Sequence, residues 1–162
     1  MFLEVKPDGR IRHLVVFCFR NDNTPADHSN IPNQQTILQA LAKRTYCSKK
    51  ALSDAYFLTR VHLDDVKYNI IRTQFGGSTS QVMMQGDINS PATFIRVMGD
   101  LFHDELGKFI LVYIDDMFIF SDSFEQHIEH HKHACRKLKE HKFYANPKKS
   151  VFIVAKLDIL AR

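Results

Sequence analysis

The chain has 162 residues, of which 44% are hydrophobic and 25% are charged, a composition typical of a globular domain that argues against a disordered tail or a fibre. Its longest apolar run, residues 109–114, is far shorter than the roughly 20 residues that a membrane-spanning helix needs. Lysine and arginine outnumber aspartate and glutamate by 22 to 18, and the resulting net charge of +4 permits a polyanionic partner without requiring one.

The first part of the chain predicts two strands, a loop and a helix. Residues 2–5 and 11–19 are predicted strands joined by a turn, and the apolar run in the second favours a strand buried on both faces. Residues 20–33 are rich in turn-forming side chains and are predicted as a loop. A helix is predicted over residues 33–43, where isoleucine and leucine recur at helical spacing.

The middle of the chain predicts a further strand, a hairpin and a second helix. We expect a strand over residues 56–62, and a hairpin formed by residues 69–76 and 79–84 around two consecutive glycines. A helix follows over residues 90–106, since apolar side chains recur there every three or four positions and a glycine comes next.

The last part of the chain predicts a hairpin, a long helix and a final strand. Two short apolar runs, residues 109–113 and 117–120, flank a pair of aspartates. A predicted helix over residues 123–142 and a strand over residues 151–154 follow. Because strands and helices do not alternate strictly, the sequence predicts an α+β fold, an antiparallel sheet with helices packed on one face.

Asp115 and Asp116 stand between two hydrophobic strands. Adjacent carboxylates beside a buried sheet are costly to desolvate and repel each other. At a hairpin turn a divalent cation could neutralise both, and oxygen ligands of this kind suit magnesium. Aspartate is also a common turn residue, so a polar hairpin turn explains the pair equally well.

Two other segments carry residues that suit a nucleotide site. Gln85 and Gly86 lie on a predicted loop before the helix at residue 90, where backbone can come close to a ligand. Tyr56 follows a predicted turn, and an aromatic ring can form the floor of a sugar pocket. A loop amide and a packed aromatic ring are the ordinary structural alternatives.

Together these segments resemble reverse transcriptases, specifically the polymerase of gypsy-like LTR retrotransposons of the fungal type. The resemblance covers nearly the whole chain, and its motifs occur in the family's order. These motifs are Arg12-His13-Leu14-Val15, Leu52-Ser53-Asp54-Ala55-Tyr56-Phe57, Gln85-Gly86 through Ser90-Pro91-Ala92-Thr93-Phe94, Tyr113-Ile114-Asp115-Asp116 and Asn146-Pro147-Lys148-Lys149.

The resemblance implies the fingers–palm part of a right-hand polymerase that makes DNA on an RNA template. In that family two magnesium ions, for which manganese can substitute, assist nucleotidyl transfer. The implied partners are an RNA or DNA template–primer and deoxynucleoside triphosphates. Asp115 and Asp116 are implied to be catalytic metal ligands, two of three such carboxylates. The residues implied to contact the nucleotide are Arg12, Asp54, Ala55, Tyr56, Gln85, Gly86 and Lys148.

One departure from the family's pattern bears on activity. The third metal-binding carboxylate is expected two positions before Ser53, where this chain has Ala51, and a methyl group cannot bind magnesium. Asp54 is no substitute, because side chains in extended structure alternate faces and an odd offset points it away. Lys50 is expected either to bring positive charge near the site or to point to solvent. We therefore predict that this copy is inactive or severely impaired.

The resemblance also implies a domain organisation. We expect residues 1–50 to form a partial fingers-like segment and residues 51–162 a palm-like domain, with thumb, RNase H and integrase absent. The alternative is a non-enzymatic degenerate remnant that acts at most as a nucleic-acid-binding or interaction module. Three widely spaced cysteines and the lack of a secretory signal favour an intracellular protein, cytoplasmic or nuclear, with no membrane partner.

The predicted helix over residues 123–142 is crowded with histidines. His127 and His131 are four residues apart, a spacing that can bind zinc. Because the helix is also dense in charged residues, a solvated face is favoured for most of them. His131 and Cys135 lie on the apolar stripe, and we expect them to pack against the sheet.

Overall fold

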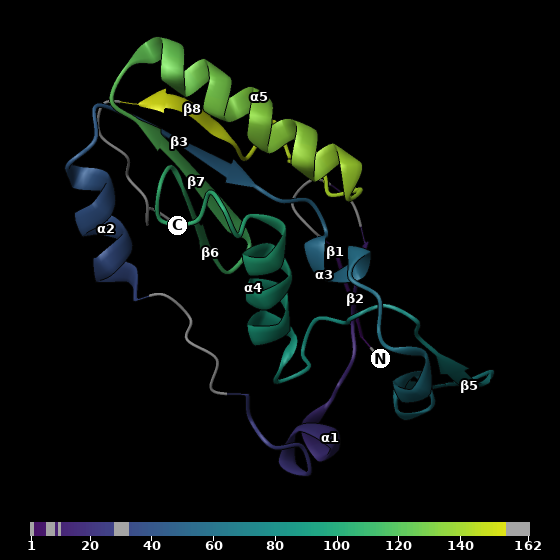
Figure 1. The fold of residues 1–162 in the computed structure, drawn as a ribbon. Helices are drawn as coiled ribbons and strands as arrows, with labels where there is room; N and C mark the ends of the chain where they lie inside the picture. The colour runs from purple at the N-terminus through teal and green to yellow at the C-terminus, as the bar shows by residue number, and fades with distance from the viewer. Residues whose placement is uncertain (1, 6–8, 10, 28–32, 155–162) are drawn as a thin grey trace. The chain divides into compact units, whose positions relative to one another are not determined.

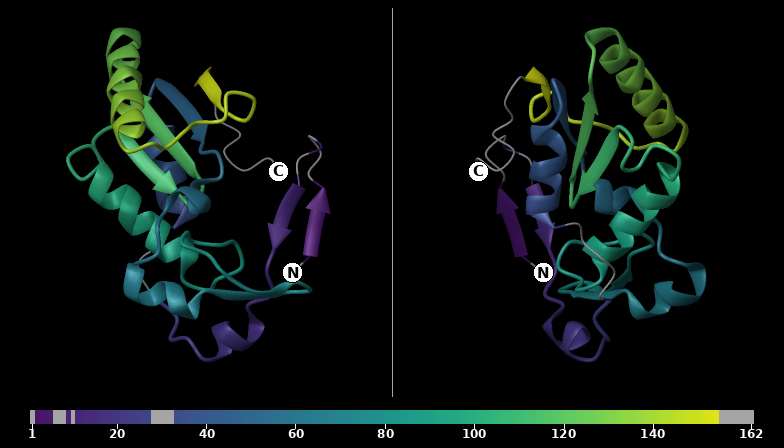
Figure 2. Two further views of the ribbon diagram at one scale, coloured as in Figure 1. Left: turned by 90° about the vertical axis from the view of Figure 1, so that its right-hand side faces the viewer. Right: turned by 60° about the vertical axis from the view of Figure 1, so that its left-hand side comes forward.

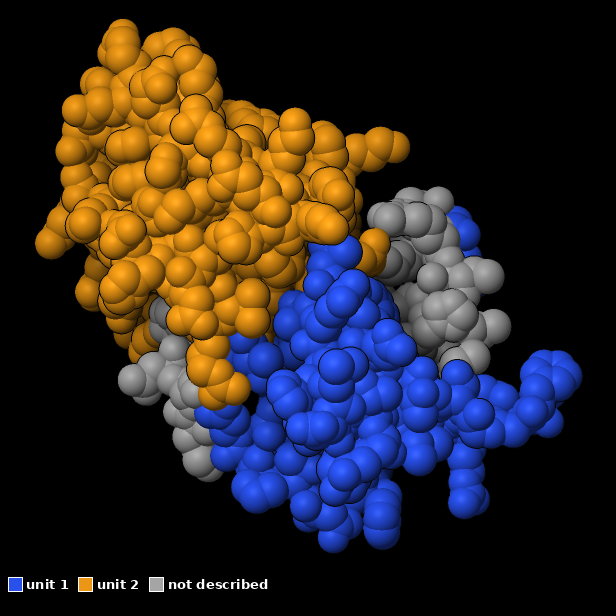
Figure 3. All heavy atoms as spheres, turned by 45° about the vertical axis from the view of Figure 1, so that its right-hand side comes forward, with its two compact units in different colours: residues 1–28, 56–93 blue, residues 29–55, 94–162 orange. Residues whose placement is uncertain are grey.

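The computed structural model describes residues 2–5, 9, 11–27 and 33–154, and the chain forms two compact units (Figure 3). Unit 1 comprises residues 1–28 and 56–93, and unit 2 comprises residues 29–55 and 94–162. Within the described ranges, the longest helices are too short or too polar to span a membrane. The predicted boundary between residues 50 and 51 lies inside unit 2, so the division into fingers-like and palm-like parts stays a prediction.

A four-stranded antiparallel sheet in the order β6-β7-β3-β8 forms the centre of unit 2 (Figure 1). Its strands are β3 (Tyr46–Ala51), β6 (Ile110–Tyr113), β7 (Asp116–Ser121) and β8 (Val151–Val154). β6 and β7 form the predicted hairpin, and β3 pairs with the whole length of β7. The α+β class and the antiparallel sheet are confirmed.

Helices pack against both faces of this sheet (Figure 2), whereas the sequence predicted helices on one face only, because the apolar side chains of α2 also bury against the strands. α5 (Phe124–Glu140) lies along one face and is the helix that the sequence places there. α2 (Gln34–Ala42) packs on the other face. The buried cluster between α2 and the sheet consists of Ile37, Leu41, Cys47, Phe118 and Phe120.

Both of these helices begin at a side-chain cap, as their sequences predict. Asn33 Oδ1 accepts a hydrogen bond from the backbone N–H of Gln35 at 2.9 Å. Ser123 Oγ accepts one from the backbone N–H of Gln126 at 3.3 Å. Each cap satisfies a donor that the first helical turn cannot, which fixes where α2 and α5 start.

Unit 1 consists of two hairpins and short helices. β1 (Phe2–Val5) pairs with β2 (Ile11–Leu14), and β4 (Ile70–Thr73) pairs with β5 (Gly76–Thr79). Two short helical segments accompany them, α1 (Cys18–Asp22) and the 3-10 helix η1 (Leu63–Tyr68). The chain passes between the units at α3 (Ala55–Leu58) and within α4 (Ser90–Leu101).

The prediction of one buried strand over residues 11–19 is wrong. The strand ends at Leu14, and residues 18–22 form a helical turn. Phe17 is buried, but Val16 and Phe19 are 57% and 84% exposed, so the apolar run is not buried on both faces. Local hydrogen bonding from Asn21 N to Phe17 O at 2.7 Å stabilises the turn instead.

The strand predicted over residues 56–62 is also wrong. Residues 55–58 form α3, and Arg60 makes only an isolated bridge with Val82. The strand of this region is β3, which the sequence analysis did not predict because its centre reads Ser48-Lys49-Lys50. Such polar residues are tolerated in a central strand because α5 supplies partners for Ser48 and Lys50, and Asp116 of β7 pairs with Lys49.

Two further boundaries differ from the prediction. α4 ends at Leu101, five residues before the predicted end, and the chain turns over residues 102–105. In the hairpin of β4 and β5 the turn is formed by Gln74 and Phe75 rather than by the glycines, which belong to β5.

Candidate functional site

The acidic pair forms part of the tight turn between β6 and β7. Tyr113 pairs with Asp116 across the hairpin, which leaves Ile114 and Asp115 as the two turn residues. Ile114 has a φ of 51°, the sign that a type II′ turn requires at its first central residue. A β-branched side chain is strained in this region by about 1–3 kcal/mol, so the paired strands must hold the turn in place.

Ala51 lies directly beside this acidic turn. In the β3–β7 register Ala51 is the partner of Asp116, and directly opposed residues share a face of the sheet. The backbone N–H of Leu52 donates to the carbonyl of Asp115 at 3.0 Å, which continues the pairing past the end of β3. A carboxylate at position 51 would therefore stand next to that of Asp116, and a methyl group stands there instead.

The loop that carries Lys148 approaches the same end of β3. The backbone N–H of Asn146 donates to the carbonyl of Ala51 at 2.8 Å, and that of Ser53 donates to Tyr144 at 2.7 Å. Asn146 Oδ1 accepts from the backbone N–H of Lys148 at 3.0 Å, which shapes the turn and leaves the lysine side chain exposed. Unit 2 thus brings the acidic turn, residue 51 and the Lys148 loop together.

An ion pair occupies the acidic turn. Lys49 Nζ lies 2.6 Å from Asp116 Oδ2, with side chains that are 22% and 26% exposed. Oδ1 of Asp115 is buried. Lys49 was not among the predicted site residues. Strand alternation puts Lys49 on the same face as Ala51, but its pairing with Asp116 follows only from the register of β3 and β7.

The two expectations for Lys50 are both wrong. Its side chain is only 3% exposed and lies on the opposite face of β3, toward α5. Lys50 Nζ is 3.3 Å from Cys135 Sγ and 4.9 Å from the centre of the Phe152 ring. Strand alternation explains the difference, because consecutive residues point to opposite faces.

Gln85 and Gly86 lie on a loop of unit 1 that the side chain of Asn21 holds. Asn21 Nδ2 donates to the carbonyl of Gly86 at 2.9 Å, and Asn21 Oδ1 accepts from Ile88 N at 3.1 Å. Gly86 has a φ of 105°, and a Cβ there would lie 3.1 Å from the carbonyl oxygen of Val15. Glycine is required at this position for both reasons.

The remaining nucleotide-contacting candidates are placed as follows. Tyr56 is 8% exposed on α3, and Ala55 begins that helix with 3% exposure. Asp54 has a φ of 48°, so the chain is not extended there and the argument from strand alternation does not apply to it. Arg12 lies on β2 opposite Glu4, and its side chain is outside the described part of the structure.

His127 is buried, not part of a solvated face as its helix predicted. Its Nε2 lies 2.8 Å from Ser48 Oγ and its Nδ1 lies 3.0 Å from Ser121 Oγ, so the ring bridges β3 and β7. Burial, reinforced by the charges of His130 and Lys50, lowers the pKa of His127. This arrangement gives the imidazole a structural role as a neutral hydrogen-bonding group.

His131 packs beside it, as expected. Burial, together with the charges of Lys50 and the neighbouring histidines, lowers the pKa of His131 to about 4. Among residues 33–154 and the other described ranges, no three side chains of the metal-binding types converge as a metal site. Nε2 of His131 lies 3.2 Å from Nε2 of His127, and the centres of the two rings are 4.7 Å apart, so the two histidines pack against each other.

Comparison with known proteins assigns the chain to a family. A family model described as "Reverse transcriptase (RNA-dependent DNA polymerase)" matches residues 9–161. The chain belongs to the reverse transcriptase family. The predicted resemblance to reverse transcriptases is confirmed at this level.

Two of its relatives are polyproteins much longer than this chain. The chain is 28% identical over 152 residues to Polyprotein P3 of Commelina yellow mottle virus, covering 94% of the chain and 8% of that protein. It is 33% identical over 127 residues to the retrovirus-related Pol polyprotein from transposon 297 of Drosophila melanogaster, covering 76% of the chain and 12% of that protein. The chain thus spans a small part of the polyproteins that it matches.

A solved structure supports the fold. The foamy viral protease–reverse transcriptase in complex with double-stranded DNA matches 98% of the chain and 28% of that protein, with a TM-score of 0.85 and 23% identity. The fold is therefore the fingers–palm type of α+β polymerase. The chain is a reverse transcriptase domain of the kind found in retrotransposon and retroviral polyproteins.

Proposed function

We propose that this chain is the fingers–palm part of a gypsy-like LTR retrotransposon polymerase, of the fungal type, whose nucleotidyl-transfer centre is defective. The observation that carries the proposal is the β3–β7 register, which pairs Ala51 with Asp116. In this proposal Asp115 and Asp116 are the two remaining metal-binding carboxylates, and the third carboxylate is missing. Loss of one ligand at such a centre lowers the rate by at least about 10³-fold, or about 4 kcal/mol of transition-state stabilisation.

The residues present do not fit a pair of magnesium ions. Reverse transcriptases generally use a divalent metal, and magnesium or manganese in such centres is held by carboxylates and substrate phosphates. Position 51 offers a methyl group, and one of the two remaining carboxylates, that of Asp116, is in an ion pair with Lys49. One of the three expected carboxylate ligands is therefore missing, and a second, that of Asp116, is already paired with an ammonium group.

The proposal keeps the other predicted roles. The residues assigned to the nucleotide are Arg12, Asp54, Ala55, Tyr56, Gln85, Gly86 and Lys148. Consistent with this, Gly86 leaves the loop backbone uncovered by a side chain, and Lys148 is exposed on a loop anchored to Ala51. We propose an intracellular location, in cytoplasm or nucleus, where template–primer nucleic acids occur.

A second candidate function is nucleic-acid binding without catalysis. The structural relative named above was solved with double-stranded DNA, and another foamy viral structure holds an RNA/DNA hybrid. The net charge of +4 suits a polyanionic partner. A chain that lost only the third carboxylate would keep the phosphate contacts on which affinity depends.

Primer extension tests the proposal. The chain, with Asp115→Asn as its matched variant, is incubated with an RNA template, a DNA primer and magnesium or manganese. We expect no incorporation above background by either protein. Incorporation by the unmodified chain that Asp115→Asn abolishes would overturn the proposed defect.

Filter binding separates the two candidate functions. We expect the chain to retain an RNA/DNA hybrid with an affinity that falls steeply as salt rises. Such binding without incorporation supports a nucleic-acid-binding remnant. Absence of binding at low salt contradicts the second function and leaves a domain with no polymerase-related activity.

A further inference from the structure

The ammonium group of Lys49 lies beside the acidic turn, where a metal cation would bind in the proposed centre. It lies on β3 two residues before Ala51, and the two side chains share the face that also carries Asp116. Lys49 is the register partner of Phe118, so it reaches Asp116 diagonally across the β3–β7 pair. The ammonium lies 2.6 Å from Asp116 Oδ2, and both side chains are largely withdrawn from solvent.

The acidic turn needs a positive charge near it. Asp115 and Asp116 are consecutive, and Oδ1 of Asp115 is buried. Carboxylates held together at a sheet edge repel each other unless a cation compensates them. A divalent ion can supply that charge when three carboxylates converge, but a side-chain ammonium is sufficient when only two remain.

Two other lysines of the described part of unit 2, Lys50 and Lys148, do not take this place. Lys50 points to the α5 face and contacts Cys135 and Phe152. Lys148 has an exposed side chain, and its backbone N–H donates a hydrogen bond to Asn146 Oδ1. Lys49 alone among these three is within ion-pair distance of the turn.

We propose that the Lys49 ammonium is the built-in counter-cation of the acidic turn and that it keeps divalent metal out. This inference rests on the proposed function, and it deepens it. The site has lost one ligand at position 51 and has a second ligand occupied at position 116. Restoring the carboxylate alone leaves Lys49 competing with the metal, so full recovery of metal binding requires both changes.

Manganese binding to four proteins tests the inference without any nucleic acid. The proteins are the unmodified chain, Ala51→Asp, Lys49→Met and the double variant, and free manganese is followed by electron paramagnetic resonance. We expect no saturable binding by the unmodified chain and weak binding by each single variant. The double variant is expected to bind at least about tenfold more tightly than Ala51→Asp, an effect of the size seen when partners of a metal site change.

A matched control separates the ion pair from general charge. Lys132→Met removes the same charge from the exposed face of α5, where Lys132 pairs with Glu129 at 2.7 Å. Combined with Ala51→Asp, it is expected to leave manganese affinity unchanged. Equal affinity of Ala51→Asp and the Lys49→Met double variant would overturn the inference, and so would equal tightening by Lys132→Met.

A second measurement applies if Lys49→Met disturbs folding. Unfolding by urea is compared for Lys49→Met, Asp116→Asn and their combination, since the combination removes both charges. We expect Lys49→Met to cost much less stability in the Asp116→Asn background, whereas additive effects would contradict the ion pair. Primer extension by the unmodified chain would refute the proposed function. The manganese-binding and unfolding results would still show whether Lys49 is the counter-cation of the acidic turn.

Discussion

Lys49 and Lys50 are neighbours on β3, but their side chains lie in different environments on opposite faces of the sheet. Lys49 lies on the face that holds Ala51 and Asp116, where its ammonium pairs with a carboxylate at 2.6 Å. Lys50 lies on the face covered by α5, where it is 3% exposed and contacts a thiol and an aromatic ring. One residue of displacement along a strand separates a charged site from a buried polar interface.

The two faces also differ in how they satisfy polar groups. On the α5 face, Ser48 and Ser121 are hydrogen-bonded to His127, so hydroxyls and a neutral imidazole satisfy one another. On the other face, the charge of Asp116 is compensated by Lys49. The α5 face is therefore built for stability, and the face with the acidic turn retains the remnant of a charged site.

The largest expected effect comes from removing the imidazole of the α5 face. His127→Ala deletes a ring with no exposed surface and removes one hydrogen bond each from Ser48 and Ser121, which keep Ile153 N and His130 Nδ1 as their other partners. We expect a loss of about 3 kcal/mol in the free energy of unfolding, from the cavity and the two lost hydrogen bonds together. Urea unfolding followed by circular dichroism measures it.

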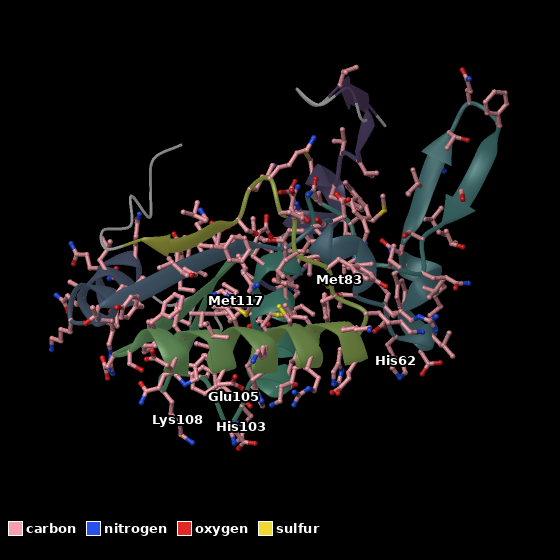
Figure 4. All side chains as sticks on the ribbon, turned by 90° about the horizontal axis from the view of Figure 1, so that it is seen from above. His62, Met83, His103, Glu105, Lys108 and Met117 are labelled. Carbon is pink, nitrogen blue, oxygen red and sulfur yellow. The ribbon has the colours of Figure 1, made fainter. Side chains whose placement is uncertain are left out.

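His103→Ala is the matched control for that variant. His103 is exposed on the turn after α4, and Figure 4 labels it beside Glu105. Its substitution should change the free energy of unfolding by less than about 0.5 kcal/mol. If His127→Ala costs no more than this control, the hydrogen-bonded bridge between β3 and β7 does not stabilise the fold.

Lowering the pH should weaken the same face. The pKa of His131 is lowered to about 4, chiefly by burial, whereas an unfolded histidine titrates near 6.5. Between these values the unfolded chain binds more protons than the native one, so stability is fully present above about pH 6.5 and falls as pH drops toward 4. We expect His131 to account for about 2 kcal/mol of this loss, allowing for its partial exposure.

His131→Leu provides the check on that slope. The variant should lose less stability than the unmodified chain between about pH 6.5 and 4.5, and His127, whose pKa burial also lowers, should account for part of the slope that remains. Hydrogen bonds from Lys137 and His133 outweigh burial and leave the pKa of Glu105 below its ordinary value, so that carboxylate contributes only at more acidic pH. An undiminished slope in His131→Leu would assign the pH dependence to other groups.

The two faces of the sheet differ in how much of their structure could be predicted from the sequence. The acidic hairpin and the start of α5 were predictable, because alternating apolar runs, a turn pair and a serine cap are local signals. β3 was not, because its polar centre is stabilised by His127 and Cys135, which lie far along the chain. The pairing of Lys49 with Asp116 depends on the register of two distant strands, which no local pattern encodes.

The smallest expected effect, and the sharpest test of the comparison, is one substitution made at both lysines. Lys49→Met removes the counter-charge of Asp116, and we expect it to destabilise the fold by about 1 kcal/mol, since the pair is partly exposed. Lys50→Met keeps a side chain of similar length in the buried site and removes an ammonium whose contacts there are a thiol and a ring. We expect it to stabilise the fold by about 1 kcal/mol.

If Lys49→Met destabilises the fold and Lys50→Met stabilises it, then the face of the strand, rather than the residue type, decides how each lysine affects stability. The measurement is the free energy of unfolding in urea at pH 7 for both variants, with Lys132→Met as the exposed reference. Raising the salt concentration should reduce the Lys49→Met effect, because screening weakens a partly exposed pair, and leave the Lys50→Met effect nearly unchanged. Two effects of the same sign would mean that Lys50 stabilises its apolar site through the thiol and the ring, and the contrast between the faces would then lie in their partners alone.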